Sequence, residues 1–478
     1  MIASIAPPPH GTDTMTAIDR IKSVLGPKGW SEDPAEIGPL ASDWRGRYQG
    51  ETPLLVKPAS TEEVSKVVAI CHEAGIAITP QGGNTGLVGG GTPQGEILLT
   101  TRRMNAVRET DIGNDSLTVE AGCVLETIQH VAADAGRLFP LSLGSQGTAT
   151  IGGLISTNAG GVHVLRYGMM RDLVLGLEAV LPDGRVWNGL RGLRKDNTGY
   201  DLKQMLIGAE GTLGVITAAT LKLFPKPGEI SVAFTAIDSP DAAVSLLGHM
   251  KTATGGALSA LELVPRNALE LVVEHIPGTR DPFADAHPWY ALLEIGAARP
   301  GEGREMMEAA LGEAFEAGLI RDAVIAESEQ QAKDFWNLRE PIAEAEKAHG
   351  RAAKHDVSIP VSKMPAFMAE ATEAAERMLP GVMIIAFGHV GDGNVHFNVA
   401  RTEPGAGLDF AKSTEPVTAM IYDKVAKYGG SISAEHGIGI MKRTELAEKR
   451  PLDVELMKAI KTALDPKGIM NPRMIFGA

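Results

Sequence analysis

The sequence predicts an α+β protein with two or three domains, and three observations point to that class. The chain has 478 residues, whereas one domain commonly holds about 150. Short apolar runs alternate along it with segments of helical periodicity. It is 44% hydrophobic and 22% charged, the composition of an ordinary soluble globular protein. We expect a leader with an N-terminal helix, two domains and a closing segment, with boundaries at 1–29, 30–225, 226–430 and 431–478.

Charge and composition narrow the expected partners and location. The net charge is −14, and a surface of that sign repels nucleic-acid phosphate and offers no basic patch to a membrane. No apolar run reaches the ~18 residues that would span a bilayer. Cys71 and Cys123 are too few for a disulfide framework, and residues 1–15 lack a secretory signal. We therefore predict a cytoplasmic protein, with Met15 as an alternative start.

Local signals predict the elements of the first domain in order. A capping box at residues 60–63 starts a helix that Gly75 ends. A short buried strand is expected at 76–79, directly after that helix. Residues 178–189 predict a hairpin, because two apolar runs flank a Pro-Asp-Gly turn.

Three glycine-rich stretches lie in the first domain, at residues 80–93, 140–161 and 208–217. Because glycine has no Cβ, main-chain N–H groups there can approach a bulky anion such as pyrophosphate. A Rossmann unit would need GxGxxG spacing and a helix after the first stretch, whereas residues 96–101 predict a strand. The stretches therefore favour a large phosphate-bearing cofactor other than nicotinamide. A purely structural turn is the alternative for any single stretch.

The second domain is expected to begin at residues 224–229, where two prolines fall. Apolar alternating runs follow, interleaved with Ala/Glu-rich helical segments. The runs are 231–237, 290–295 and 383–390, and the helical segments are 303–318, 340–349 and 364–378. This order predicts a mixed sheet with helices on one face. A last helix is expected at 453–464.

A histidine pair in the second domain predicts a metal site. The segment around it predicts a strand, a Gly-Asp-Gly-Asn turn and a second strand, with His389 directly opposite His396. Such neighbours lie ~4.5–5.5 Å apart at Cβ, and Asn398 shares their face. Glu435, expected beside His436 in another apolar strand, offers a third ligand. The set suits Zn²⁺, Mn²⁺ or Fe²⁺; a buried histidine without metal is the alternative for either residue alone.

The three glycine stretches, with LRYG at 165–168, resemble the FAD-binding domain of the vanillyl-alcohol oxidase family. The C-terminal half, with HVGDGNVH and AEHGIG, resembles that family's D-2-hydroxyacid dehydrogenase branch. The resemblance covers nearly the whole chain. It implies a two-part FAD-binding domain over 30–225, an α+β substrate or cap domain over 226–430, and a C-terminal segment that returns to the FAD domain.

The resemblance assigns FAD contacts to all three stretches. Residues 80–86 would wrap the pyrophosphate, 145–158 would line the flavin, and 210–216 would close over the adenine and ribose. The implied contacts are Pro80, Gln81, Gly82, Gly83, Asn84, Thr85, Gly86, Ser145, Thr148, Gly152, Gly153, Ser156, Asn158, Glu210, Gly211 and Ile216. Other branches attach FAD through a histidine early in the first stretch, where this chain has Gln, Gly and Asn. We therefore expect non-covalent FAD.

The resemblance also assigns a divalent metal, with zinc as the first choice, and a substrate carboxylate. The implied metal ligands are His389, His396 and Glu435, and the implied substrate residues are Arg339, Lys354 and Asn398. Arginine grips a carboxylate bidentately, while lysine provides a point charge. The D-2-hydroxyglutarate enzymes carry a hydroxyl residue four positions after the arginine, where this chain has Ala343. D-Lactate or another acid therefore stays an alternative to D-2-hydroxyglutarate.

The resulting prediction is a dehydrogenase, dependent on FAD and a divalent metal, that oxidises D-2-hydroxyglutarate to its 2-oxoacid. The metal would lower the pKa of the substrate hydroxyl, His436 would take the proton, and the C2 hydride would pass to the flavin. His436 as a mere support for Glu435 is the alternative. D-Lactate or glycolate oxidation, a flavin subunit of a larger membrane-bound oxidase, and a metal-free flavin oxidase also stay open. By resemblance, the electron acceptor is an electron-transfer flavoprotein or a quinone. A homodimer is the commonest assembly among soluble proteins.

Overall fold

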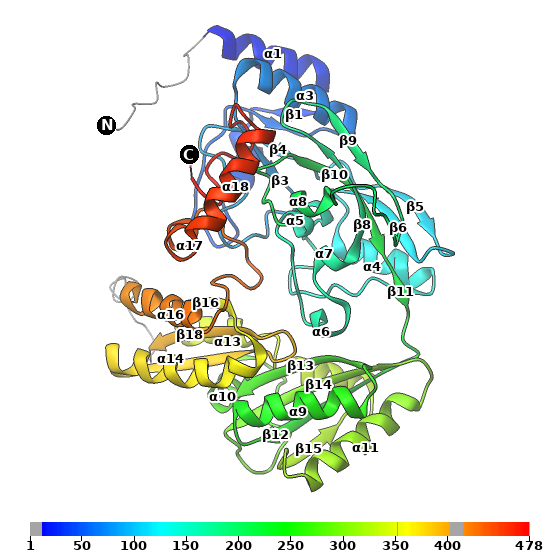
Figure 1. Cartoon of the computed structure of the whole chain (residues 1–478), viewed down its shortest axis with the longest axis vertical. Coiled ribbons are helices and arrows are strands. Elements are labelled where there is room, and N and C mark those ends of the chain that lie inside the picture. The colour runs from blue at the N-terminus through cyan, green and yellow to red at the C-terminus, as the bar shows by residue number, and fades with distance from the viewer. Residues whose placement is uncertain (1–11, 351, 402–413, 478) are drawn as a thin grey trace.

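The computed structural model describes residues 12–350, 352–401 and 414–477. The predicted leader lies outside these residues, apart from the start of helix α1 (Thr12–Leu25). Figure 1 shows two bodies of structure. The blue-to-teal N-terminal part is joined by the red C-terminal helices, and the green-to-orange part forms the second body.

The first sheet of the N-terminal body has four strands in the order β1-β2-β4-β3. They are β1 (Trp30–Ser31), β2 (Leu55–Val56), β3 (Ile78–Gln81) and β4 (Ile97–Thr100). Both β2 and β3 pair with β4 in parallel, and helix α3 (Thr61–Ala74) connects β2 to β3. This helix is capped as predicted: Ser60 accepts the N–H of Glu63, and Gly75 has φ 68°. β4 confirms the strand expected after the first glycine stretch.

The second sheet of this body has five antiparallel strands in the order β5-β6-β10-β8-β9. They are β5 (Val107–Asp111), β6 (Ser116–Glu120), β8 (Val174–Val180), β9 (Val186–Gly189) and β10 (Val215–Lys222). The other helices between α1 and the second body are α2 (Pro34–Ala41), α4 (Leu125–Asp134), α5 (Ile151–Ser156), α6 (Val164–Tyr167), α7 (Met170–Leu173) and α8 (Lys203–Leu206). β8 and β9 form the predicted hairpin. Leu117, Ile128 and Ile155 are completely buried between the sheet and its helices.

The second body is one seven-stranded sheet in the order β15-β12-β14-β13-β17-β18-β16. A short pair of strands, β7 (Arg137–Leu138) and β11 (Phe224–Pro225), precedes it. The seven strands are β12 (Glu229–Ile237), β13 (Leu258–Pro265), β14 (Trp289–Ala297), β15 (Asp322–Ile325), β16 (Ala352–Ser358), β17 (Val382–His389) and β18 (Asn394–Arg401).

The expected mixed sheet with helices on one face is wrong for this body. Its strand pairs are all antiparallel, and helices cover both faces. One face packs on α9 (Pro240–Ala253), α11 (Glu302–Glu316), α14 (Met364–Met378) and α16 (Glu415–Lys427). The other packs on α10 (Arg266–His275), α12 (Glu329–Trp336) and α13 (Ile342–His349). The reason is that alternate residues on both sides are apolar: in β13, Leu261 and Leu263 enter one core and Val264 enters the other.

The C-terminal segment returns to the N-terminal body. After helices α17 (Arg443–Lys449) and α18 (Pro451–Leu464), Met470 forms a bridge to Ile78 of β3. Asn471 donates to the main-chain oxygens of Gly90 and Glu210. Figure 1 shows these red helices beside β3 and β4. Among the described residues, no helix combines the length and apolarity that a membrane crossing requires.

Candidate functional site

The two predicted metal histidines lie on neighbouring strands, β17 and β18, but not directly opposite each other. His389 pairs with Asn394, and His396 pairs with Phe387, so the predicted register is wrong. The connection begins one residue earlier than expected, because Gly393 takes a left-handed φ of 78° that closes the turn. Since the pairing moves by an even number of residues, both imidazoles still share one face of the sheet. They are diagonal neighbours.

His389, His396 and Glu435 come together at one point of the molecule. The ring centroids of the two histidines are 5.6 Å apart, and His389 Nε2 lies 3.6 Å from Oε1 of Glu435. One ligand atom from each residue can be chosen so that all lie within 4.8 Å of one another. A divalent ion with ligand distances of about 2.0–2.2 Å fits among such atoms. Two imidazoles and one carboxylate leave coordination positions open, which is the pattern of a catalytic metal.

The segment that carries Glu435 is a loop, not the strand that the sequence predicted. Among residues 430–442, Ser431 forms an isolated bridge to Ser358 of β16, and these residues form no regular strand. Gly437 and Gly439 have φ of 79° and 54°, and these left-handed conformations break an extended strand. The glycines thus turn the chain directly after the Glu-His pair.

Glu210 fastens this loop to the N-terminal body. Its buried carboxylate accepts the N–H groups of Ile438 at 2.7 Å and Gly439 at 2.8 Å. Burial raises the pKa of this carboxyl, and the two hydrogen bonds act against the shift. A Cβ on Gly437 would lie 2.8 Å from Glu210 Oε1, so the close approach requires glycine. The sequence predicted that Glu210 covers the adenine and ribose. Its carboxylate instead binds the loop that follows Glu435, one of the proposed metal ligands.

Sequence reasoning missed Glu262, which orients His389. Glu262 lies in β13, directly opposite His389, and is completely buried. Its Oε1 accepts from His389 Nδ1 at 2.7 Å, and its Oε2 pairs with Arg339 at 2.9 Å. Metal-bound histidines commonly donate their second ring N–H to a carboxylate in this way. His389 Nε2 is thereby left to face Glu435.

The pKa values of His389 and His396 are shifted in opposite directions. Burial disfavours the charged form of His389, but the Glu262 carboxylate outweighs burial and raises the pKa of His389 to about 10. Burial lowers the pKa of His396 to about 4. His396 is therefore neutral near pH 7, which is the form that binds a metal.

Asp356 is the second missed residue, and it orients the Glu-His pair. It lies in β16 opposite His396. Its Oδ2 accepts the main-chain N–H groups of Glu435 at 3.0 Å and His436 at 3.2 Å, and His436 Nδ1 lies 3.3 Å away. Burial would raise the pKa of Asp356, but the neighbouring His436 and His396 hold it well below its usual range. A carboxylate inside the apolar strand β13 is the sequence signal that could have found Glu262. Asp356 follows Lys354 and His355 in β16 and carries no such signal.

The three predicted substrate residues are each paired with a buried acid. Arg339 is bound to Glu262. Lys354 and Asn398 face each other across β16 and β18, and both contact Glu346 of α13. Lys354 Nζ lies 2.5 Å from Glu346 Oε2, and Asn398 Nδ2 donates to the same oxygen at 3.0 Å. Glu346 is the third residue that sequence reasoning missed.

The predicted FAD segments come together in the N-terminal body. A Cβ on Gly82 would lie 2.2 Å from Thr150 Oγ1, and one on Gly83 would lie 2.3 Å from Thr148 O. The first two glycine stretches are therefore in direct main-chain contact. Within the described part of the chain, the main-chain N–H groups of residues 82–91 donate no hydrogen bond to another protein atom, and buried Thr150 Oγ1 has no partner. Unpaired donors on a glycine loop fit a pyrophosphate.

Other predicted cofactor residues hold these stretches in place. Gln81 donates to Gly91 O at 2.8 Å, and Asn84 donates to Ser42 O at 2.7 Å. Asn158 accepts from the N–H of Arg171. Ser156 donates to Gly152 O within α5. A Cβ on Gly211 would lie 2.9 Å from Pro80, so the third stretch meets the first, while Ile216 is buried in the apolar core.

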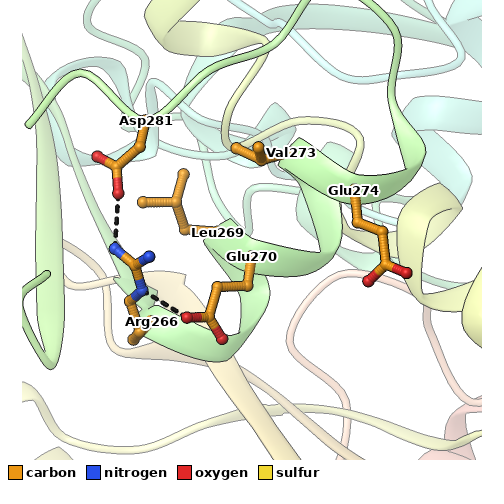
Figure 2. A pocket seen from close by; sticks show the side chains of 6 residues that line it. All are labelled: Arg266, Leu269, Glu270, Val273, Glu274 and Asp281. Atoms are coloured by element: carbon orange, nitrogen blue, oxygen red, sulfur yellow. Dashed lines mark hydrogen bonds and ion pairs between the residues drawn. The ribbon is translucent and has the colours of Figure 1, made fainter.

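Two cavities lie apart from these residues. The larger, of about 690 Å³, is lined by the loop after α10 and by α12 and the start of α13. The smaller, of about 180 Å³, lies beside α10 (Figure 2). There Arg266 is held by Glu270 and Asp281. Neither cavity is lined by a predicted metal, substrate or cofactor residue.

Comparison with known families decides what the two bodies are. Residues 52–189 match the FAD binding domain model, and residues 226–475 match the model for the C-terminal domain of FAD linked oxidases. The chain belongs to the FAD-linked oxidases. The predicted FAD cofactor is therefore supported by a matching domain.

Individual relatives place this FAD-linked oxidase more closely. It is 39% identical over 457 residues to the mitochondrial D-2-hydroxyglutarate dehydrogenase of Arabidopsis thaliana, covering 95% of this chain and 80% of that protein. It is 36% identical over 472 residues to a putative mitochondrial D-lactate dehydrogenase of Schizosaccharomyces pombe, covering 94% and 88%. A structure of 4-ethylphenol oxidase from Gulosibacter chungangensis matches with a TM-score of 0.74 and 20% identity over 97% of both chains, which shows the shared fold. The predicted resemblance to the D-2-hydroxyacid dehydrogenase branch and the α+β fold are confirmed.

The prediction of a cytoplasmic protein is contradicted by these relatives. Both relatives in this branch carry the word mitochondrial in their names. The prediction depended on the missing secretory signal and on cysteine content, and neither bears on import into mitochondria. Import segments are amphipathic and rich in arginine and serine instead of having a long apolar stretch.

Proposed function

We propose that this FAD-linked oxidase oxidises a D-2-hydroxyacid to the 2-oxoacid at a centre formed by His389, His396 and Glu435. The observation that supports the proposal is the convergence of these residues on the side that meets the FAD-binding body. The turn after β17 packs against α6, where a Cβ on Gly391 would lie 2.9 Å from Leu165. Arg166 of α6 donates to Ala257 O and Gly296 O of the sheet body. The segment that follows the predicted flavin-lining residues 145–158 therefore packs against the turn between the two strands that carry the metal histidines.

The residues divide the chemistry among them. A divalent metal, when bound, supplies a Lewis acid that lowers the pKa of the substrate hydroxyl. FAD, when bound, accepts the C2 hydride. His436 is the proposed base: Asp356 holds its Nδ1 side and leaves Nε2 to accept the hydroxyl proton. Glu262 and Asp356 fix the ligands and the base before substrate arrives.

The identity of the D-2-hydroxyacid is a separate part of the proposal, and two observations favour different acids. D-2-Hydroxyglutarate was predicted from Lys354 and Asn398, and it is the acid in the name of the Arabidopsis relative. Glu346, however, already neutralises Lys354 and occupies Asn398. An acid without a second carboxylate, such as D-lactate, needs neither residue free.

The test is anaerobic mixing of the FAD-loaded protein with D- and L-2-hydroxyacids, followed through loss of the visible flavin absorbance. We expect reduction by D-acids alone, its loss after treatment with a strong chelator, and its return with Zn²⁺ or Mn²⁺. Undiminished reduction after chelation would contradict the metal role. Release of peroxide in air would instead support a flavin oxidase, and lack of turnover by the isolated chain with a redox dye would support a subunit of a larger assembly. Electron-transfer flavoprotein and a quinone are the proposed acceptors to compare next.

A further inference from the structure

Glu346 is a buried carboxylate that the proposed reaction does not use. It lies in α13 and is 1% exposed. Its Oε2 contacts Lys354 and Asn398. Its Oε1 is also buried, and no atom among the described residues makes a hydrogen bond with it. One oxygen of this carboxylate is therefore paired and the other is not.

A buried hydrogen-bond acceptor without a donor lowers the stability of the folded protein, and an apolar residue at position 346 would avoid this loss. Leaving such a group unsatisfied costs about 1–3 kcal/mol, and more when it is charged. Burial raises the pKa of Glu346, while Lys354 and Asn398 act against the shift. Its neighbours Ile342 and Ala345 pack into an apolar core from the same helix. A native buried group of this kind calls for a partner that the described residues do not supply, such as a water or a bound ligand.

The position of Glu346 relates it to the metal ligands. Its partner Asn398 lies on β18 two residues after His396, on the same face of the sheet. At about 3.4 Å per residue, the two side chains stand about 7 Å apart along the strand. That spacing suits the far end of a five-carbon acid whose C2 lies at the metal ligands. Glu346, whose Oε2 accepts from Asn398 Nδ2, thus lies beside the residue that would face the substrate's remote end.

We propose that Glu346 makes this end of the site a subsite for a hydrogen-bond donor, so that the preferred D-2-hydroxyacid ends in a hydroxyl or amino group. The inference rests on the proposed function and names the substrate class of that same site. A second carboxylate finds the charge of Lys354 already neutralised and meets a carboxylate oxygen of like charge. Arg45 also acts on Glu346, but its exposed side chain is screened by water.

The test uses four D-acids of equal length that differ only at C5. They are D-2-hydroxyglutarate, D-2,5-dihydroxypentanoate, D-5-amino-2-hydroxypentanoate and D-2-hydroxypentanoate. With wild-type protein we expect kcat/KM for the hydroxyl or amino acid to exceed that for D-2-hydroxyglutarate by at least about tenfold, which is about 1.4 kcal/mol. With Glu346→Leu we expect kcat/KM for D-2-hydroxyglutarate to rise about tenfold, because Lys354 is released, and that for the hydroxyl acid to fall.

The control is Glu344→Leu, which removes an exposed carboxylate from the same helix. It should leave the ranking of the four acids unchanged. A wild-type protein that prefers D-2-hydroxyglutarate over the hydroxyl and amino acids would overturn the inference, while the proposed function would stand. If neither these four acids nor D-lactate reduced the flavin, the proposed function itself would fail, whereas reduction by D-lactate alone would overturn the inference. Should Glu346→Leu not fold, the wild-type ranking alone decides.

Discussion

The two halves of the site bind their partners with different parts of the polypeptide. On the FAD side, the unpaired main-chain N–H groups belong to one continuous stretch, residues 82–91. On the metal side, the binding atoms are side chains from β17, β18 and the loop after Ser433. These are held by carboxylates of two further strands, β13 and β16. A main-chain site needs only a local conformation, whereas a side-chain site needs several strands in the right register.

This difference implies that the two halves can be disrupted separately. The supports of the metal ligands, Glu262 and Asp356, are distant from the glycine stretch in sequence and belong to the other body. Glu210 and Val88 of the FAD-binding body accept main-chain N–H groups of the loop after Glu435, and Ile475 of the C-terminal segment donates to Gly439 O of the same loop. Substitutions on one side should therefore change one bound group and spare the other.

The largest effect is expected from His396→Ala. Removing one of the three proposed ligands should abolish metal binding and lower kcat/KM by roughly 10³-fold or more, since the Lewis acid contributes several kcal/mol. FAD content, measured from the visible spectrum, should stay unchanged. His130→Ala, which removes an exposed histidine of α4, is the control. A variant that retains metal by elemental analysis would refute the ligand assignment.

Gly83→Val should weaken FAD binding and leave metal binding intact, the reverse of the result expected for His396→Ala. The added side chain must displace Thr148 O, because even a Cβ would lie 2.3 Å from it. We expect FAD affinity to fall by roughly 100-fold, about 2.7 kcal/mol, within the usual cost of overpacking. Metal content should persist. Gly38→Ala is the control, because a Cβ there meets nothing within 4 Å; equal FAD loss in both variants would show that the close contact is unimportant.

A smaller effect is expected from Glu262→Gln. The amide keeps the shape of the side chain but loses the charge that orients His389 and pairs with Arg339. Metal affinity should fall about 10–100-fold, the usual result of removing such a support. Titration with Zn²⁺ against a competing chelator measures it, and FAD binding should not change. Glu274→Gln, at an exposed position of α10, should leave the affinity intact.

The smallest effect concerns the contact between the two bodies. His163 follows the second glycine stretch, and its Nε2 lies 2.9 Å from Glu294 of β14. Burial alone lowers the pKa of His163, but the bond and charge of Glu294 outweigh it, so the pKa is raised. The pKa of Glu294 is lowered, since His163 outweighs the effect of burial.

The sign of the pH dependence follows from these two shifts. The raised pKa of His163 gives stability that is complete below its ordinary value near 6.5 and is lost as pH rises through the folded value. His163→Gln should therefore lower the melting temperature by about 1–3 °C near pH 6 and by less near pH 9. Thermal unfolding of both proteins across this range measures the difference. A difference that grew with pH would show that the charged pair does not form.

Part of the site could be predicted from the sequence because its signals are local. The glycine stretches and the HVGDGNVH and AEHGIG segments are continuous, and the structure brings His389, His396 and Glu435 together. The register of β17 and β18 could not be predicted, because it depends on the φ of Gly393 and not on the apolar alternation. The Glu435 segment was assigned to a strand because its apolar residues concealed the turns at Gly437 and Gly439.

The sequence by itself determined the α+β class, the family, the capped helix α3 and the residues that carry the predicted chemistry. Each of these depends on residue types within a short window, which local conformational preference and solvent exclusion are enough to specify. Only the tertiary structure decided that Glu262, Asp356 and Glu346 face the predicted residues. Their strands and helix lie far apart in the chain, and long-range pairing across the sheet sets which buried charge meets which.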